Sequence, residues 1–409
     1  MFLQYDPGQA ATGGRTGSQG QMTHDSTRDP VAHHFPPAPR GPFKDVPGAQ
    51  WRNWHWQLQH RVREVADLDA LGFPLTADER RAAEATRSEF RVAITPYYAG
   101  LMDPDDPGCP VRLQALPRMG ETEADSWDLV DPLAEERDMP VPGITHRYPD
   151  RVLFYISPDC AVFCRHCTRK RKVSDPATAA NDDQIRGGIE YVRRHPEVRD
   201  VIVSGGDPLA FSDDRLEWIL RDVRAIPHVE IIRVGTRVPV TMPHRITPET
   251  AAMLGRYHPL FVNTHFNHPK ECTREAYEAC RNLAEAGIPL GNPLVLLRGV
   301  NDDAEVVKRT NQLLLMMRVR PYYIYLCDLA RGNRHFRTTY EKGLEIMRAL
   351  RGWTSGLAVP YLVIDAPGGG GKVPILPNYV EERDDEKVVV RNFRGTRHVY
   401  YEPVDVKKS

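Results

Sequence analysis

The sequence predicts an α/β protein whose core is a partial (β/α)6 barrel, with a mainly helical region before the barrel and a C-terminal extension after it. Short apolar runs recur between residues 152 and 326, and helical patterns separate them. The strand candidates are 152–156, 201–204, 230–234, 260–264, 290–297 and 321–326. Strands that alternate with helices pair in parallel through right-handed crossovers. Chemically reactive residue types recur just past the strand ends, which is typical of a barrel rim and favours a barrel over an open doubly wound sheet.

Helices between these strands are indicated by apolar residues at spacings of three and four. Ile185, Ile189 and Val192, for example, share one face of the first helix. The other helices are expected around 216–223, from Thr247-Pro248, from Thr273 to Gly287, over 302–318 and near 339–351. One more strand is expected at 361–364, after the last of these helices.

Composition divides the chain into four parts. Residues 1–45 are rich in Gly, Pro, Ser, Thr and Gln and are predicted to form a disordered N-terminal extension. Residues 46–145 are predicted to form helices up to about residue 100 and then a segment, rich in proline and acidic residues, that wraps the core. The core is assigned to 146–366, and a glycine-rich loop and tail to 367–409.

Charge and hydropathy exclude several classes of protein. Lys and Arg total 54 against 55 Asp and Glu, so the net charge of −1 gives no basis for binding nucleic acid or an anionic membrane. No apolar run approaches the roughly 20 residues of a membrane span, and the N-terminus is polar. Seven cysteines, three of them clustered, indicate reduced thiols and a metal centre rather than disulfides. A cytoplasmic protein is expected.

The clustered cysteines are Cys160, Cys164 and Cys167, directly after the first strand of the core. Three thiolates can hold a [4Fe-4S] cubane and leave its fourth iron open to an outside ligand, a metal-site arrangement distinct from the four thiolates of a closed cluster. The alternative is a zinc site made of the three thiolates and His166. Zinc sites of this kind usually combine two separated cysteine pairs, so the spacing favours the open cluster.

Two glycine-rich segments follow other strands of the core. Gly205, Gly206 and Asp207 come after the second strand, where glycines allow either a close approach to a ligand or simply a tight turn. Four glycines, 368–371, and then Lys372 come after the seventh strand. Glycine-rich backbone suits a phosphate, and the lysine suits either that phosphate or an aldehyde. Val373 after the lysine excludes a P-loop. A phosphate and an aldehyde together indicate pyridoxal phosphate.

With these motifs the chain closely resembles the lysine 2,3-aminomutase family, which comprises radical S-adenosylmethionine enzymes that also carry pyridoxal phosphate. The resemblance runs from about Trp51 to the C-terminus and includes literal stretches at 146–151, 164–169 and 296–302. It implies an amino acid substrate and a 5′-deoxyadenosyl radical mechanism in which pyridoxal phosphate assists a 1,2-amino migration. It also implies an electron donor such as flavodoxin or ferredoxin.

The resemblance assigns roles to individual residues. Cys160, Cys164 and Cys167 are the implied cluster ligands, and S-adenosylmethionine binds the open iron. Gly205, Gly206 and Asp207 form the loop that meets its methionine end, and His265, past the fourth strand, is a further cofactor-binding candidate. Lys372 is the implied attachment point of pyridoxal phosphate, and Arg147, Tyr148 and Arg151 belong to its phosphate and ring pocket. Arg169 is expected to bind the substrate α-carboxylate, as the bidentate geometry of arginine allows.

Asp328 and Asp365, past the sixth and seventh strands, indicate the substrate class. In lysine-specific members of the family, aspartates at these positions bind the distal ammonium group, and glutamate-specific members replace them with a basic residue and an amide. Two desolvated carboxylates repel each other unless a cation lies between them, so a cationic side chain is favoured. Lysine is favoured over arginine, and an arginine 2,3-aminomutase is the alternative. More distant alternatives are another radical S-adenosylmethionine enzyme or a structural metal-binding protein.

The chain departs from the family pattern in two respects. Typical members bind a structural zinc through C-terminal cysteines and one more cysteine, but the tail here has none and Asp303 occupies the other position. These differences predict no zinc site and argue against the usual tetramer, although a homo-oligomer is still expected. In addition, Pro293 replaces a glutamine and removes an amide near the cofactor.

Overall fold

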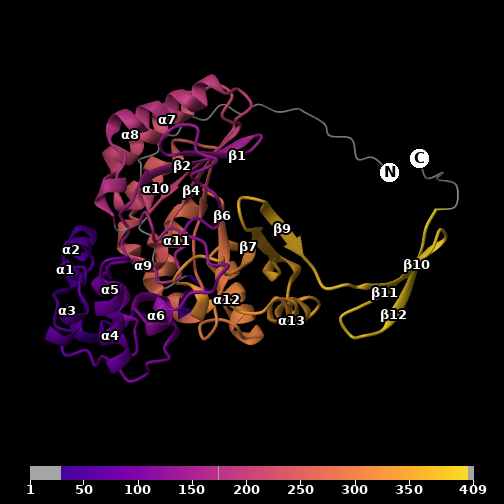
Figure 1. Cartoon of the computed structure of the whole chain (residues 1–409), viewed down its shortest axis with the longest axis horizontal. Helices are drawn as coiled ribbons and strands as arrows, with labels where there is room; N and C mark the ends of the chain where they lie inside the picture. Colours follow the sequence, from indigo (N-terminus) through magenta and orange to yellow (C-terminus); the bar gives the residue numbers. More distant parts are fainter. Residues whose placement is uncertain (1–28, 174, 404–409) are drawn as a thin grey trace, which may run out of the picture.

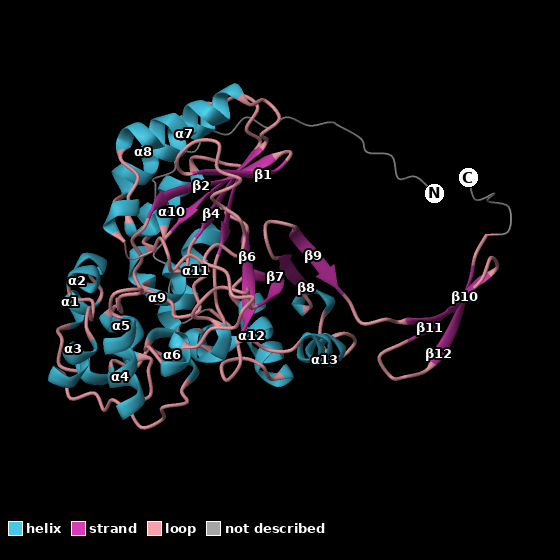
Figure 2. Ribbon diagram, in the orientation of Figure 1, coloured by secondary structure: helices cyan, strands magenta, loops and turns pink. Residues whose placement is uncertain are grey.

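Seven parallel strands, β2 to β8, form the wall of a partial barrel (Figures 1 and 2). The computed structural model describes residues 29–173 and 175–403. The strands of the main sheet are β1 (Ile144–Tyr148), β2 (Arg151–Ser157), β3 (Asp200–Gly205), β4 (Ile231–Gly235), β5 (Leu260–Asn263), β6 (Leu290–Leu296), β7 (Val319–Leu326), β8 (Tyr361–Ala366) and β9 (Gly371–Ile375). They lie in this order, and the two edge strands β1 and β9 pair antiparallel to their neighbours. The predicted fold class, a partial barrel, is confirmed.

Helices connect the parallel strands and cover the outside of the barrel (Figure 2). They are α7 (Asp182–Arg194), α8 (Asp213–Arg224), α9 (Val238–Thr241), α10 (Pro248–Gly255), α11 (Arg274–Glu285), α12 (Ala304–Met316) and α13 (Tyr340–Leu350). The N-terminal region contains α1 (Gly48–Trp51), α2 (Trp54–Gln59), α3 (Val65–Ala70), α4 (Ala77–Thr86), α5 (Pro96–Gly100) and α6 (Pro110–Ala115). No helix in the described ranges is long and apolar enough to cross a membrane.

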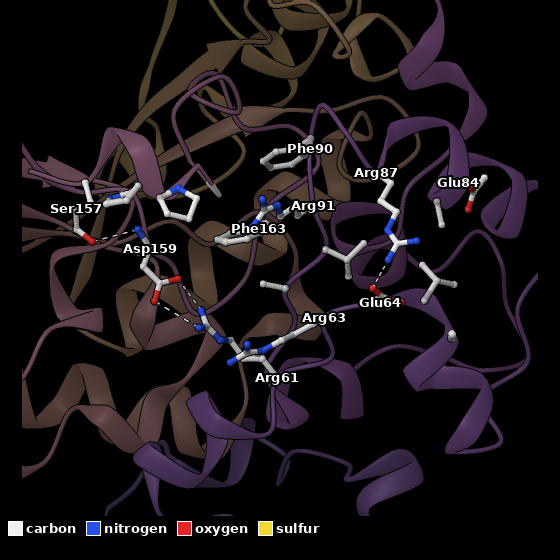
Figure 3. A pocket seen from close by; sticks show the side chains of 18 of the residues that line it. Arg61, Arg63, Glu64, Glu84, Arg87, Phe90, Arg91, Ser157, Asp159 and Phe163 are labelled. Carbon is white, nitrogen blue, oxygen red and sulfur yellow. Dashed lines mark hydrogen bonds and ion pairs between the residues drawn. The ribbon is translucent and has the colours of Figure 1, made fainter.

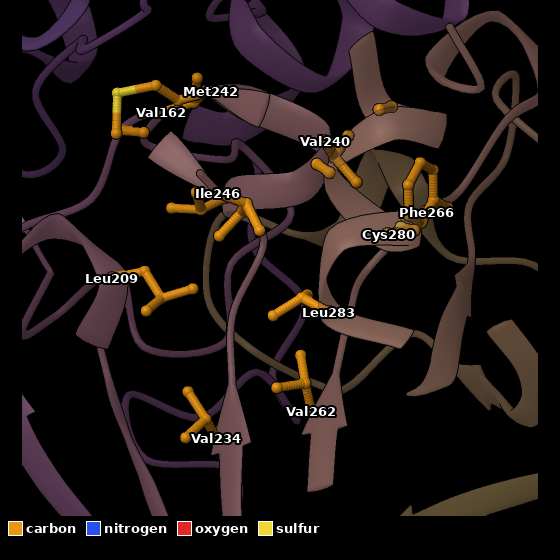
Figure 4. Packing of buried hydrophobic residues seen from close by; sticks show 14 of the residues in the cluster. Val162, Leu209, Val234, Val240, Met242, Ile246, Val262, Phe266, Cys280 and Leu283 are labelled. Carbon is orange, nitrogen blue, oxygen red and sulfur yellow. The ribbon is translucent and has the colours of Figure 1, made fainter. Parts of the chain in front are cut away.

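The core lies between the strands and the helices that cover them. Figure 4 shows Val234 on β4 and Val262 on β5 beneath Leu283 of α11, and all three side chains are fully buried. Full burial of such a side chain stabilises the fold by about 1.5–3 kcal/mol. In β3, Val201 and Val203 are buried, whereas the alternate residues Ile202 and Ser204 line a central cavity. The two-residue period of the strands therefore separates the core from the interior of the barrel.

The disorder predicted for residues 1–45 is wrong for the part from residue 29 onward; residues 1–28 lie outside the described residues. Phe35 is buried and its ring stacks on Tyr277 at a centroid distance of 4.6 Å. The backbone N–H of Ala38 also donates to Glu275 at 2.9 Å. Individual aromatic anchors in a proline-rich segment have no helical or strand period, which is why the sequence pattern did not reveal this packing.

The end of the chain also contains more strands than the loop and tail that the sequence indicated. Lys372 lies on β9 rather than in a loop, because Gly368, Gly369 and Gly371 have φ values of 71°, 84° and 82° that allow a tight reversal after β8. Beyond β9, a separate three-stranded sheet extends away from the barrel (Figure 1). Its strands are β10 (Val380–Arg383), β11 (Lys387–Arg391) and β12 (Arg397–Tyr401). The predicted boundaries at 46, 146 and 367 remain predictions.

Candidate active site

A cavity of about 800 Å³ inside the barrel brings together the site residues that the family resemblance implies, whereas the glycines 368–371 do not line it. Volumes in this range suit the binding of small molecules and cofactors. The predicted residues that line it are Arg147, Tyr148, Arg151, Cys160, Cys164, Cys167, Arg169, Gly205, Gly206, Asp207, His265, Asp328, Asp365 and Lys372. They come from the edge strands β1 and β9, from the parallel strands β2, β3 and β8, and from the loops that follow the parallel strands. The fold thus places them around one space, and their individual roles remain predictions.

The three clustered thiols lie on the loop that follows β2. All three are free and line the cavity. Burial and then the neighbouring Cys164 raise the pKa of Cys167 to about 11, so a positively charged centre is needed to hold the thiolate forms together. Within the described ranges, no three His, Cys, Asp or Glu side chains converge as ligands of a single ion. A cubane needs three thiolates that each bind a different iron, and the free cysteines of this loop can supply them.

The glycine pair at the end of β3 lets the following loop pack directly on the end of β2 and the start of the cysteine loop. The N–H of Gly206 donates to the carbonyl of Ser157 at 2.5 Å, and a Cβ at Gly205 would lie 2.6 Å from the same oxygen. Asp207 is fully engaged, since its carboxylate accepts from Thr236 Oγ1 at 2.7 Å and from the N–H of Arg237 at 2.7 Å. Burial raises the pKa of Asp207 to about 6, although these hydrogen bonds oppose the rise. Its side chain therefore fastens the loop, and a ligand would meet the loop backbone.

His265 presents an unsatisfied polar atom to the cavity. Its Nε2 is buried and has no hydrogen-bond partner among the described residues. Burial, together with the nearby Arg237 charge, lowers the pKa of His265 to about 3, so the imidazole is neutral. A buried polar atom without a partner is costly, which fits a ligand that completes its hydrogen bond.

Two carboxylates of the cavity lie near Lys372, and one of them pairs with it. Asp365 and Lys372 face each other across β8 and β9, and the Nζ of Lys372 lies 2.8 Å from Oδ2 of Asp365. Oδ1 of Asp365 is buried without a partner in the part of the chain that the structure describes. Asp328 accepts from Thr168 Oγ1 at 3.1 Å. Burial and then the charge of Asp365 raise the pKa of Asp328 to about 7. The pair thus has the capacity to bind a further cation.

Arginines and a tyrosine lie next to Lys372. The Oη of Tyr148 accepts from the backbone N–H of Lys372 at 3.1 Å. The guanidinium of Arg151 lies 3.9 Å from the centroid of the Tyr148 ring, and Arg147 Nε donates to Asp138 at 2.9 Å. Two guanidinium groups beside a lysine and an aromatic ring fit a phosphorylated aromatic aldehyde such as pyridoxal phosphate.

Glu135 is a site residue that the sequence did not reveal. It is buried, lines the cavity, and accepts from Arg169 Nε at 2.7 Å, while the two Nη atoms of Arg169 have no hydrogen-bond partner in the described ranges. Burial alone would raise the pKa of Glu135, but Arg169 and Arg171 outweigh it and hold the pKa below its ordinary value. Glu135 therefore fixes the orientation of Arg169 and leaves its outer edge open. Its position in an acidic surface-like segment gave no signal of this.

A larger cavity, of about 1070 Å³, lies between the N-terminal helices and the outer side of the cysteine loop (Figure 3). It contains none of the predicted residues, and its charges are mostly paired, with Arg61 2.7 Å from Asp159 and Arg87 bound to Glu64. Arg61 also donates to the carbonyl of Cys160 at 2.5 Å. These contacts support the cysteine loop from outside the barrel. Because the predicted site residues line the other cavity, we assign the chemistry to the barrel cavity.

Comparison with known proteins identifies the family. Residues 154–309 match the family model of the radical SAM superfamily, and residues 347–409 match the model described as lysine-2,3-aminomutase. L-lysine 2,3-aminomutase of Clostridium subterminale is 52% identical over 89% of this chain and 87% of its own length. The enzyme of the same name from Fusobacterium nucleatum is 52% identical over 88% of this chain and 85% of its own length. Glutamate 2,3-aminomutase of Clostridioides difficile is 46% identical over 88% and 85% of the two chains. The predicted resemblance is confirmed, and the chain belongs to the lysine 2,3-aminomutase family of radical S-adenosylmethionine enzymes.

Proposed function

We propose that this protein is an isomerase that converts L-lysine to L-β-lysine. The observation that carries the proposal is the pair of carboxylates in the cavity, the buried Asp365 and the half-buried Asp328. The ammonium of a lysine side chain would neutralise them, whereas the carboxylate of glutamate would be repelled. Relatives named L-lysine 2,3-aminomutase, at 52% identity, support the same substrate.

Membership of the superfamily implies an iron–sulfur cluster and S-adenosylmethionine, and we propose pyridoxal phosphate as the third cofactor. When bound, the first two supply a 5′-deoxyadenosyl radical, and pyridoxal phosphate supplies the π-system that assists amino migration. Cys160, Cys164 and Cys167 would hold the cluster, and Lys372 would hold pyridoxal phosphate, with Arg147 and Arg151 on its phosphate. Arg169 would bind the α-carboxylate of the substrate and the two aspartates its side chain. These contacts align the reacting carbon atoms and exclude water.

Product analysis tests the proposal. The protein would be reconstituted anaerobically with iron, sulfide, pyridoxal phosphate, S-adenosylmethionine and a reductant, and L-lysine, L-arginine and L-glutamate would be offered separately. We expect β-lysine as the preferred product, identified by mass spectrometry against β-amino acid standards. Preferred formation of β-arginine would reassign the substrate, and the absence of any β-amino acid would overturn the proposed activity.

Lysine binding should weaken at low pH because of Asp328. Its pKa of about 7 means that the carboxylate is charged above this pH and becomes protonated as the pH falls through it. A neutral carboxyl group attracts the substrate ammonium less, so the Kd of L-lysine should rise by up to about tenfold for each pH unit below the pKa. Binding titrations of the reconstituted protein between pH 5.5 and 8.5 would measure this. The slope of log Kd against pH should correspond to the uptake of one proton. If Asp328→Asn showed the same inflection, the assignment to Asp328 would be wrong.

Replacing Glu135 with glutamine should raise the KM for L-lysine about tenfold while kcat changes little, since a neutral hydrogen bond to Arg169 is weaker than a charged one. Steady-state kinetics of Glu135→Gln would measure the effect. Glu136→Gln is the matched control. Glu136 follows Glu135 directly in the chain, but it is exposed and pairs with Lys172 at 2.9 Å instead of with Arg169. Equal KM values in the two variants would contradict a positioning role for Glu135.

We also propose a homo-oligomer in the cytoplasm that receives electrons from a flavodoxin or ferredoxin. The three-stranded sheet that extends from the barrel exposes Val399, Tyr400 and Tyr401, which are 49%, 66% and 73% accessible. Exposed apolar and aromatic surface of this kind favours contact with another chain. All seven cysteines are free thiols, as a reducing compartment would maintain them. The prediction that the protein binds no zinc remains open to metal analysis.

A further inference from the structure

We propose that Arg237 raises the reduction potential of the iron–sulfur cluster by donating a charged hydrogen bond to the sulfur of Cys164. This inference rests on the proposed function, in which Cys164 is a cluster ligand. Arg237 lies just after β4, at the start of α9, and its side chain is buried. Its Nη1 is 2.7 Å from Sγ of Cys164. No sequence motif pointed to this residue.

The guanidinium of Arg237 is held in place from its other side. Its Nη2 donates to Glu271 at 2.7 Å and to Gln114 at 2.6 Å. Its Nε donates to the carbonyl of His265 at 3.1 Å. Glu271 is itself fully buried and accepts from the backbone N–H of Asn267 at 2.6 Å. Because every edge of the guanidinium has a partner, the Arg237 side chain is held in one rotamer. Its N–H toward Cys164 is therefore preorganised.

Among the three thiols, this contact is specific to Cys164. In the described parts of the chain, the sulfurs of Cys160 and Cys167 take part in no hydrogen bond with a charged group. They pack instead against an apolar group formed by Phe90, Ala93, Phe163 and Val173. The sulfur of Cys164 would therefore accept a hydrogen bond from a permanent cation. The other two sulfurs pack against hydrocarbon, and Cys167 meets the charges of Arg169 and Lys170 without a hydrogen bond from either.

The physical consequence concerns the one-electron reduction that starts the reaction. An external donor of the flavodoxin type passes one electron to the cluster, and the cluster gains one negative charge while no proton is required. A fixed positive charge and an N–H donor beside a ligating sulfur stabilise that added charge more than they stabilise the oxidised form. Arg237 should therefore make the cluster easier to reduce. This effect concerns the reduction step and does not require an amino acid substrate.

Two substitutions with opposite expected signs test this. Arg237→Gln removes the cation, and we expect the equilibrium constant for reduction to fall about tenfold, a midpoint shift of about −59 mV for one electron. Glu271→Gln keeps Arg237 beside Cys164 and removes the negative charge behind it, so the midpoint should rise. The midpoints would be measured by redox titration, monitored by electron paramagnetic resonance, on cluster-loaded protein without amino acid. General disruption of the site would not produce shifts of opposite sign.

The matched control is Arg245→Gln. Arg245 is also fully buried and hydrogen-bonded, to Thr250 at 2.7 Å and Asp213 at 2.6 Å, but it contacts no thiol. It should lower thermal stability without moving the midpoint. If Arg237→Gln does not fold, Arg237→Lys retains the charge and should give a smaller negative shift. The inference would be overturned if the midpoint of Glu271→Gln and the midpoint of the Arg237 variant that folds, Arg237→Gln or Arg237→Lys, both matched the midpoint of the unaltered protein. Failure of the unaltered protein to bind a cluster would instead refute the proposed function.

Discussion

Replacement of Lys372 with alanine should abolish the visible absorbance of bound pyridoxal phosphate and lower turnover of L-lysine by about 10³-fold or more. Of the residues that line the cavity, Lys372 is the one lysine, and β9 presents its Nζ beside Asp365 and Tyr148. No neighbouring amine in the described cavity wall can take its place. Absorbance spectra and turnover of the reconstituted variant would measure both effects.

Lys372→Arg separates the covalent role of the lysine from its charge. The guanidinium can retain the ion pair with Asp365 but cannot form the covalent attachment, so this variant should lose the absorbance and the turnover as the alanine variant does. Lys172→Ala is the control, because Lys172 pairs with Glu136 at 2.9 Å and does not line the cavity. Iron content should be unchanged in all three variants. A visible band that persists in Lys372→Ala would show that pyridoxal phosphate is held elsewhere.

The parallel strands were predictable because each is a short apolar run between helical patterns. The run 201–204 lies within β3, Asp200–Gly205, and the run 361–364 within β8, Tyr361–Ala366. The edge strands were not predictable. The sequences of β1, Ile-Thr-His-Arg-Tyr, and β9, Gly-Lys-Val-Pro-Ile, contain no continuous apolar run, since an edge strand is stabilised largely by its one neighbour. Pairing to β2 and β8 is a tertiary event that local periodicity does not encode.

The same distinction applies to the site. The cysteine motif and the glycine run before Lys372 carry their information in local spacing. Cys160, Cys164, Cys167 and Lys372 line the cavity, although the glycines themselves do not. Glu135 and Arg237 belong to no local motif of this kind. They meet their partners Arg169 and Cys164 across 34 and 73 residues of chain, and each partner lies on another segment. Buried charged residues that orient a ligand-binding group are therefore found only once the fold is known.

Asp328→Asn should lower kcat/KM for L-lysine by about 10²-fold, because loss of one partner of a buried charge pair costs about 2–5 kcal/mol. Turnover of L-lysine and L-glutamate would be compared across pH. The asparagine variant should lose activity toward lysine at all pH values and should discriminate less against glutamate, since one repelling charge is gone. An unchanged ratio of kcat/KM for lysine and glutamate would mean that Asp328 does not select the substrate.

Thr168→Val supplies the matched comparison, because it leaves the charge of Asp328 in place and removes its hydrogen bond. That hydrogen bond lowers the pKa of Asp328 against the opposing effects of burial and of Asp365, so its loss should raise the pKa further. Thr168→Val should therefore resemble the unaltered protein at high pH and lose lysine turnover as the pH falls toward neutrality. A uniform loss in Asp328→Asn and a pH-dependent loss in Thr168→Val would together attribute lysine recognition to the ionised carboxylate. If Thr168→Val also lost activity uniformly, the shape of the site rather than its charge would be responsible.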